Sequence, residues 1–169
     1  MIRDLARQIA QEKISPVAAE FDETGEFPWD IMKVMAESDI CGIYIDEKYG
    51  GTGGGVTELA IATEEFSKAC GGIAICFAAT ALGAYPIILY GNEEQKKRYL
   101  PPIASGKKLG AFALTEAGAG SDAGAVATTA KKEGDYYILN GTKQWITNGG
   151  EADIYTVIAV TDKTKGSRG

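Results

Sequence analysis

The chain has 169 residues, 45% of them hydrophobic, and a formal net charge of −6, a composition that suffices for a folded core in one or two domains. Its lysines and arginines are not clustered as a nucleic-acid surface requires, so we expect no nucleic-acid partner. It contains no histidine, which excludes Ser-His-Asp and Cys-His catalysis and removes the commonest metal ligand.

Helical spacing of apolar residues begins at the N-terminus. It runs over residues 1–21, where Pro16 is expected to bend or divide the helix. A second helix is predicted to start at Pro28 and to end by Gly42. A third is predicted from about Thr57. Their apolar stripes are most simply interpreted as core.

An uncharged segment, residues 69–92, is the fourth predicted helix. It is long enough to span a bilayer. However, its glycines, Pro86 and alanines make it only moderately apolar, and aromatic and basic flanks do not mark both ends. We therefore expect a helix buried within a bundle, and no membrane partner. Three- and four-residue spacing places four side chains on one face of it: Ile75, Ala78, Ala79 and Leu82.

A loop, a fifth helix and a domain boundary are predicted from glycine, capping and proline signals. The glycine-rich residues 49–55 predict a flexible surface loop. Asn92 and Gln95 form a capping-box pattern that starts a fifth helix. Pro101 and Pro102, followed by residues 105–108, are expected to break its pattern. The domain boundary is expected directly afterwards, near residue 107.

The spacing then changes to that of strands. Strands are predicted over residues 109–114, 126–131, 136–139, 142–147 and 154–160. Asn140-Gly141 is a strong hairpin signal and predicts that the third and fourth of them pair. The predicted fold is a multi-domain α and β protein: an N-terminal all-α helical bundle over residues 1–107, then an incomplete antiparallel β-barrel-like domain over residues 108–169.

Cysteine usage and the N-terminus bear on location. Cys41, Cys70 and Cys76 form an odd number without C-x-x-C spacing, which favours reduced, buried side chains and no metal site. No charged region followed by an apolar region opens the chain. We expect a cytoplasmic protein.

A glycine-rich loop follows the first predicted strand and reads T-E-A-G-A-G-S-D from Thr115 to Asp122. Gly118 and Gly120 permit positive φ and leave room above the backbone for a phosphate or a polar ring edge. A mobile turn between strands is the alternative. With Gly124 the spacing is one residue off the dinucleotide fingerprint, and a strand follows where that fingerprint needs a helix. We therefore reject a nicotinamide-binding Rossmann unit.

A second motif, residues 140–150, reads N-G-T-K-Q-W-I-T-N-G-G. Together, the two motifs resemble the acyl-CoA dehydrogenase family, whose middle domain carries a T-E-P-x-A-G-S-D-like loop and a K-x-W-I-T-N-G strand in this order. Ala117 departs from the proline that is common in the family. The resemblance covers nearly the whole chain but only the first part of the family's length.

The resemblance implies α,β-dehydrogenation of an acyl-CoA thioester, with FAD as the hydride acceptor. It implies FAD contacts for eight residues: Phe112, Leu114, Thr115, Gly120, Ser121, Trp145, Ile146 and Thr147. In the family, the tryptophan backs one face of the isoalloxazine and the following threonine reaches towards its N5 atom. Substrate contacts are implied for Ser121 and for the helix face of Ile75, Ala78, Ala79 and Leu82.

The resemblance also implies an electron-transfer flavoprotein as partner, a homo-oligomer at full length and, from its likeness to butyryl-CoA dehydrogenases, a short-chain substrate. The family's catalytic glutamate lies in a C-terminal helical domain absent from these residues, so no catalytic residue is assigned and the fragment alone is expected to be inactive. The alternatives are an acyl-CoA oxidase or flavin monooxygenase of the same fold, or a non-catalytic CoA- or protein-binding module.

Overall fold

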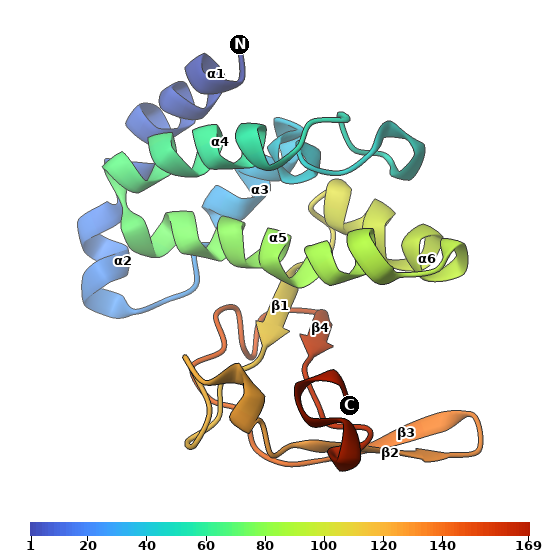
Figure 1. The fold of residues 1–169 in the computed structure, drawn as a ribbon. Coiled ribbons are helices and arrows are strands. Elements are labelled where there is room, and N and C mark those ends of the chain that lie inside the picture. The colour runs from blue at the N-terminus through green and yellow to red at the C-terminus, as the bar shows by residue number, and fades with distance from the viewer.

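The computed structural model describes residues 1–169, except for the side chains of residues 167 and 168. Its first part is helical: α1 (Ile2–Ile9), a π-helical turn η1 (Ala10–Ile14), α2 (Ala18–Thr24), α3 (Trp29–Glu37), the 3-10 turns η2 (Ile40–Gly42) and η3 (Glu47–Tyr49), α4 (Val56–Ala69), α5 (Gly71–Tyr90) and α6 (Glu93–Ala104). In Figure 1, α5 lies between α4 and the strands.

The second part holds short strands and turns: β1 (Gly110–Ala113), η4 (Ala123–Ala125), β2 (Thr129–Glu133), β3 (Tyr136–Asn140), β4 (Ile154–Val157) and η5 (Lys163–Arg168). β2 and β3 pair antiparallel, whereas β1 and β4 pair in parallel. The predicted helical part followed by the start of a β domain is confirmed, although one of its two strand pairs is parallel where antiparallel pairing was expected.

Helix starts and breaks follow the sequence signals closely. The first helical stretch is divided around Pro16, with η1 ending at Ile14 and α2 starting at Ala18. The capping box of α6 forms as predicted: the Gln95 backbone N–H donates to the Asn92 side chain (2.8 Å), and the Asn92 N–H donates to the Gln95 side chain (2.9 Å). These local signals need no tertiary context.

The helix break predicted at Pro101 and Pro102 does not occur, and the helix ends directly before Ser105. α6 continues through Pro101 and Pro102 to Ala104. The prolines lose two N–H donors, but their carbonyls remain in use: Pro101 O accepts from the Ser105 N–H (3.1 Å) and Pro102 O from the Lys108 N–H (3.0 Å). Since both prolines lie near the helix end, the missing bonds do not stop it.

The glycine-rich segment at residues 49–55 contains a loop with exposed residues, as predicted, although two of its glycines are closely packed. A Cβ at Gly51 would lie 2.7 Å from Gly42 O, and one at Gly54 would lie 2.9 Å from Glu58 Cγ. The Gly53 N–H also donates to Ile45 O (2.9 Å). These glycines therefore permit close backbone packing.

The predicted hairpin at Asn140-Gly141 is also wrong. The hairpin instead forms at the preceding chain reversal, Gly134-Asp135, where β2 pairs with β3. Gly134 has φ +62° there. Gly-Asp is itself a two-residue hairpin signal. Residues 142–147 form no strand; they run back to the first motif, where the Gln144 N–H donates to Thr115 O (2.9 Å).

Helix α5 is the element on which the β part rests. By length and composition it is apolar enough to cross a membrane, with a mean hydropathy of 2.0, and half of the window concerned is buried within the protein. It packs against α4, α6 and β1, and Phe77 meets Phe66 of α4 edge-to-face at 5.4 Å. A Cβ at Gly83 would lie 2.8 Å from Ala111 N, so glycine lets β1 approach the helix.

Candidate functional site

A hollow of about 250 Å³ lies where α5, β1 and the two motifs meet. Its lining comes from three segments far apart in the sequence: Ala79 and Leu82 of α5, Phe112, Leu114 and Thr115 in and after β1, and Trp145 and Thr147 of the second motif. All seven belong to the residues that the resemblance implies. The fold therefore brings the expected flavin-contacting and acyl-contacting residues to one place.

The other expected residues lie outside this lining: Ile75, Ala78, Gly120, Ser121 and Ile146. Ile75, Gly120 and Ser121 are exposed, and the remaining two are half-buried. Gly118 and Gly120 do not adopt the positive φ that glycine permits. A Cβ on either would meet nothing within 4 Å, so the room expected above this loop is open.

Trp145 has an unusual conformation beside the hollow. Its φ is +57°, a left-handed value that is uncommon for a bulky residue, and 84% of its surface is exposed. Strained backbone of this kind is concentrated at functional sites. An exposed indole next to an apolar hollow fits a flat aromatic ligand, and the residues present therefore fit a flavin ring.

A largely buried ion pair joins the two motifs beside Leu114, a lining residue of the hollow. Lys143 Nζ donates to Leu114 O and to Glu116 Oε1, both at 2.8 Å. The Glu116 carboxylate also accepts from the backbone N–H groups of Ala127 (2.7 Å) and Thr128 (3.0 Å). The side chains of Lys143 and Glu116 are 11% and 8% exposed. Every oxygen of this carboxylate is therefore engaged by protein donors.

These contacts keep Glu116 ionised. The Lys143 ammonium first, and then the Thr128 and Ala127 hydrogen bonds, lower the pKa of the carboxyl group from 4.5 to about 2. A general base that takes a weakly acidic proton near neutral pH needs a pKa much closer to the working pH. Glu116 is therefore a structural carboxylate.

Asn148 ties the second motif to the helical part. Its Nδ2 group donates to Cys76 O (2.9 Å), Thr80 Oγ1 (3.2 Å) and Gly110 O (3.1 Å). The residue is buried and has φ +63°, a conformation that asparagine tolerates better than most residues. It therefore fixes the end of the motif against both α5 and β1.

Sequence reasoning assigned no role to Lys143 or Asn148, although both belong to the second motif. The acceptors of Lys143 lie 27 and 29 residues away, and those of Asn148 lie 38 to 72 residues away. No local spacing indicates such contacts. The only available signal was their membership of a motif too long to be accidental.

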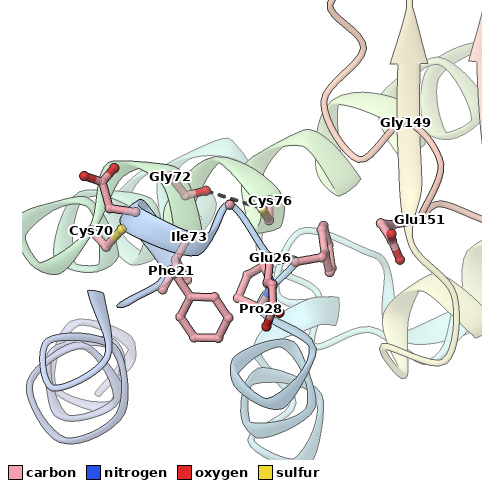
Figure 2. Close-up of a pocket in the computed structure, with 12 residues that line it drawn as sticks. Phe21, Glu26, Pro28, Cys70, Gly72, Ile73, Cys76, Gly149 and Glu151 are labelled. Atoms are coloured by element: carbon pink, nitrogen blue, oxygen red, sulfur yellow. Dashed lines mark hydrogen bonds between the residues drawn. The ribbon is translucent and has the colours of Figure 1, made fainter. Parts of the chain in front are cut away.

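A larger cavity of about 480 Å³ lies beside the first turns of α5 and contains none of the expected site residues (Figure 2). Phe21, Ile73 and Glu151 are among its lining residues. Glu151 accepts a hydrogen bond from the Trp29 indole N–H (3.1 Å). This contact gives a second tie between the loop after the second motif and the helical part.

The cysteines are free, as predicted. Only Cys41 is fully buried; Cys70 and Cys76 are half-buried and line the larger cavity, so the prediction of three buried side chains is wrong for these two. Burial, followed by the neighbouring Cys70, raises the pKa of Cys76 to about 11. Its thiol stays protonated and has the low reactivity of a structural cysteine.

The fold is a helical domain joined to the beginning of a β domain, and the hollow lies at their junction. Models of the acyl-CoA dehydrogenase N-terminal domain and of the acyl-CoA dehydrogenase middle domain match residues 1–107 and 111–169, respectively. The chain belongs to the acyl-CoA dehydrogenase family.

Curated relatives match along the whole chain. A short-chain-specific acyl-CoA dehydrogenase of Clostridium acetobutylicum is 46% identical over 100% of this chain and 45% of its own length. A 3-(aryl)acrylate reductase of Clostridium sporogenes is 49% identical, with the same coverage of both chains. The chain thus spans about 45% of the length of these relatives.

Solved structures agree with this assignment. Butyryl-CoA dehydrogenase from Megasphaera elsdenii matches with a TM-score of 0.90 and 44% identity over 98% of this chain and 44% of that one. A chain in the structure of the electron transferring flavoprotein of Acidaminococcus fermentans matches with a TM-score of 0.93 and 47% identity over the same shares. An acyl-CoA dehydrogenase from Bacillus anthracis complexed with FAD matches with a TM-score of 0.88 and 42% identity over 96% and 28%.

Proposed function

We propose that this chain supplies the helical and flavin-facing part of an FAD-dependent acyl-CoA dehydrogenase, which oxidises the bond between the α and β carbons of an acyl-CoA thioester. One observation carries the proposal: residues of both motifs line the same hollow as Ala79 and Leu82, two of the four residues of the expected acyl-contacting face of α5. The Bacillus anthracis relative, which is complexed with FAD, supports the choice of cofactor.

When bound, FAD supplies the hydride acceptor. In this chain, the exposed face of Trp145 offers a stacking surface for the ring. The backbone at residues 114–115 and the Thr147 hydroxyl, which border the same hollow, donate hydrogen bonds to the ring where negative charge develops. Ala79 and Leu82 form an apolar wall that contacts the acyl chain and excludes water from the reacting bond.

The expected residues outside the hollow extend the proposed site. Gly120 and Ser121 lie on the open loop, where they contact the FAD phosphates and, for Ser121, the CoA arm. The Ile146 backbone contacts the flavin. The exposed side of α5 at Ile75 and the adjoining Ala78 extend the acyl wall beyond Ala79. These assignments rest on the motif resemblance together with the exposure of the residues.

The chain supplies no catalytic base in this proposal. Glu116 is excluded because its carboxylate is committed to Lys143 and to two backbone N–H groups. The chain covers about 45% of its curated relatives, and the base belongs to the remainder of the enzyme. Within the proposed enzyme, residues 1–107 form the helical domain and residues 108–169 form the start of the middle domain.

The proposed substrate is a short-chain acyl-CoA, and the proposed electron acceptor is an electron-transfer flavoprotein. The complete enzyme is proposed to be a homo-oligomer located in the cytoplasm. The short-chain-specific relative from Clostridium acetobutylicum supports the substrate class. The match in the electron transferring flavoprotein structure from Acidaminococcus fermentans supports the partner.

The test is anaerobic addition of butyryl-CoA to the purified gene product that carries this chain, reconstituted with FAD. Loss of the flavin's visible absorbance and formation of the α,β-unsaturated thioester are expected, followed by recovery of the absorbance on addition of an electron-transfer flavoprotein. A flavin that stays oxidised with every acyl-CoA offered would contradict the proposal. Rapid reaction of reduced flavin with oxygen would favour an oxidase or monooxygenase, and retention of CoA without flavin a binding module.

A further inference from the structure

The ion pair between Lys143 and Glu116 is linked to the hollow through Leu114, whose carbonyl accepts from Lys143 Nζ. Buried charges are costly to desolvate, and a buried salt bridge is weak evidence of a stabilising role. This pair is largely shielded from solvent and its ammonium lies on Leu114 O, the carbonyl of a residue that lines the hollow. Its position suggests a role in the site.

The geometry of the Leu114–Thr115 peptide connects the ammonium to the hollow. The chain contains no cis peptide among its described residues, and in a trans peptide the C=O and N–H groups point in opposite directions. Because Leu114 O accepts from Lys143 Nζ at 2.8 Å, the Thr115 N–H points away from the ammonium. The next carbonyl, Thr115 O, accepts from the Gln144 N–H at 2.9 Å. The second motif thus holds two consecutive carbonyls, those of Leu114 and Thr115.

An ammonium on a carbonyl oxygen also polarises the peptide. Hydrogen bonds in a chain strengthen one another, and charge-assisted bonds are the stronger ones, so Lys143 makes the Thr115 N–H a better donor. Glu116 neutralises the ammonium and is anchored by Ala127 and Thr128. The pair therefore polarises a peptide that borders the hollow without adding net charge.

We propose that Lys143, held in place by Glu116, is a positioning residue for the flavin: it fixes the Leu114–Thr115 peptide and strengthens its N–H donor towards the polar edge of the ring. This inference rests on the proposed function and deepens it. Reduction places negative charge on that edge, and preorganised donors stabilise such charge. Lys143 therefore tightens FAD binding and raises the flavin midpoint potential.

The test is Lys143→Met in the complete gene product, with FAD affinity and midpoint potential measured by titration and by equilibration with a reference dye. We expect FAD affinity to fall by up to about tenfold, less than the loss of a charged hydrogen bond made to the ligand itself, and the midpoint potential to fall. Lys131→Met is the matched control, because Lys131 forms an exposed pair with Glu133 on β2. The Lys131→Met substitution is expected to leave the FAD affinity and the midpoint potential unchanged.

The double variant Glu116→Gln/Lys143→Met separates positioning from stability. It removes both charges, so we expect it to regain the thermal stability lost in Lys143→Met while its midpoint potential stays low. Recovery of both quantities would overturn the inference, as would an unchanged affinity and potential in Lys143→Met. A wild-type gene product that binds no FAD would instead overturn the proposed function.

Discussion

Asn148 concentrates three hydrogen bonds in one side-chain amide, to Cys76 O, Thr80 Oγ1 and Gly110 O. We expect Asn148→Ala to lower the free energy of unfolding by about 3 kcal/mol, because the acceptors lose their donor and alanine disfavours the left-handed backbone. Urea denaturation measures this loss. Asn148→Gly, which tolerates φ +63°, is the control and isolates the backbone contribution. A loss of unfolding free energy below about 0.5 kcal/mol in Asn148→Ala would equal that of an ordinary surface substitution. It would show that the amide hydrogen bonds do not stabilise the fold.

Glu116 makes the free energy of unfolding depend on pH in the acid range. Its pKa is lowered from the ordinary value of 4.5 to about 2 in the folded chain, so the folded state binds fewer protons than the unfolded state in this range. Its stabilising contribution is complete above about pH 4.5 and is lost as the pH falls towards 2. We expect Glu116→Gln to show a shallower loss of stability across that window than the wild type.

Denaturation at a series of pH values measures this slope. Glu65 has its pKa lowered to about 2 by the Arg7 and Lys68 hydrogen bonds and by Arg3, so part of the acid sensitivity remains in the Glu116 variant. Glu65→Gln is the matched control, since it removes a carboxylate of the same pKa from the helical part. Identical slopes in the wild type and Glu116→Gln would exclude the Lys143–Glu116 pair as a source of acid sensitivity.

The packing of α5 against β1 gives a prediction at the scale of elements. A Cβ at Gly83 would lie 2.8 Å from Ala111 N and 2.9 Å from Ala111 O, so Gly83→Ala must separate the helix from the strand. We expect a destabilisation of about 1–3 kcal/mol, typical of overpacking. Gly72→Ala in the same helix is the control, because its Cβ meets only Cys70 Sγ at 3.8 Å.

Helix propensity alone favours alanine over glycine by about 1 kcal/mol. Gly72→Ala is therefore expected to be neutral or stabilising. Thermal unfolding of both variants measures the contrast. Equal effects of the two substitutions would show that the close approach of α5 and β1 does not depend on Gly83.

Local sequence signals were sufficient to predict the helices. The strands were predicted less accurately, because their pairing depends on contacts between distant residues. Pro16 and the Asn92 capping box act within one turn of helix, so the sequence alone locates them. Asn140-Gly141 is a valid hairpin signal, but Gly134-Asp135 forms the hairpin, and the residues after Gly141 instead bond to Thr115. No local pattern decides between two turn signals six residues apart.

The same division holds within the candidate site. The motif resemblance identified Trp145 and Thr147, which the fold brings to the hollow with Leu114 and Thr115. It could not identify the supports behind them. Lys143 and Asn148 act on groups in other segments, and a single sequence contains no record of such distant contacts.

At the scale of the whole molecule, the helical and β parts share one core. Ile154 of β4 belongs to the buried cluster of the helices, and the Thr156 hydroxyl donates to Gly83 O of α5 (2.7 Å). We therefore expect the two parts of the 169-residue chain to unfold in one transition.

Two variants measure this directly, because the chain has two tryptophans. Trp145→Phe leaves Trp29 to report on the helical part, and Trp29→Phe leaves Trp145 to report on the second motif. Their urea midpoints by fluorescence should coincide with those of helix loss by circular dichroism. Midpoints that differ between the two reporters would show that the parts unfold independently.

The most direct test of the flavin site is an FAD titration of the gene product that carries this chain, followed by tryptophan fluorescence in the wild type and in Trp145→Phe. If Trp145 stacks on the ring, FAD quenches the wild-type emission saturably at one FAD per chain, and Trp145→Phe shows weaker binding and a smaller loss of emission. Equal affinity and equal quenching in the two proteins, or no binding of FAD by the wild type, would contradict a flavin site at this hollow.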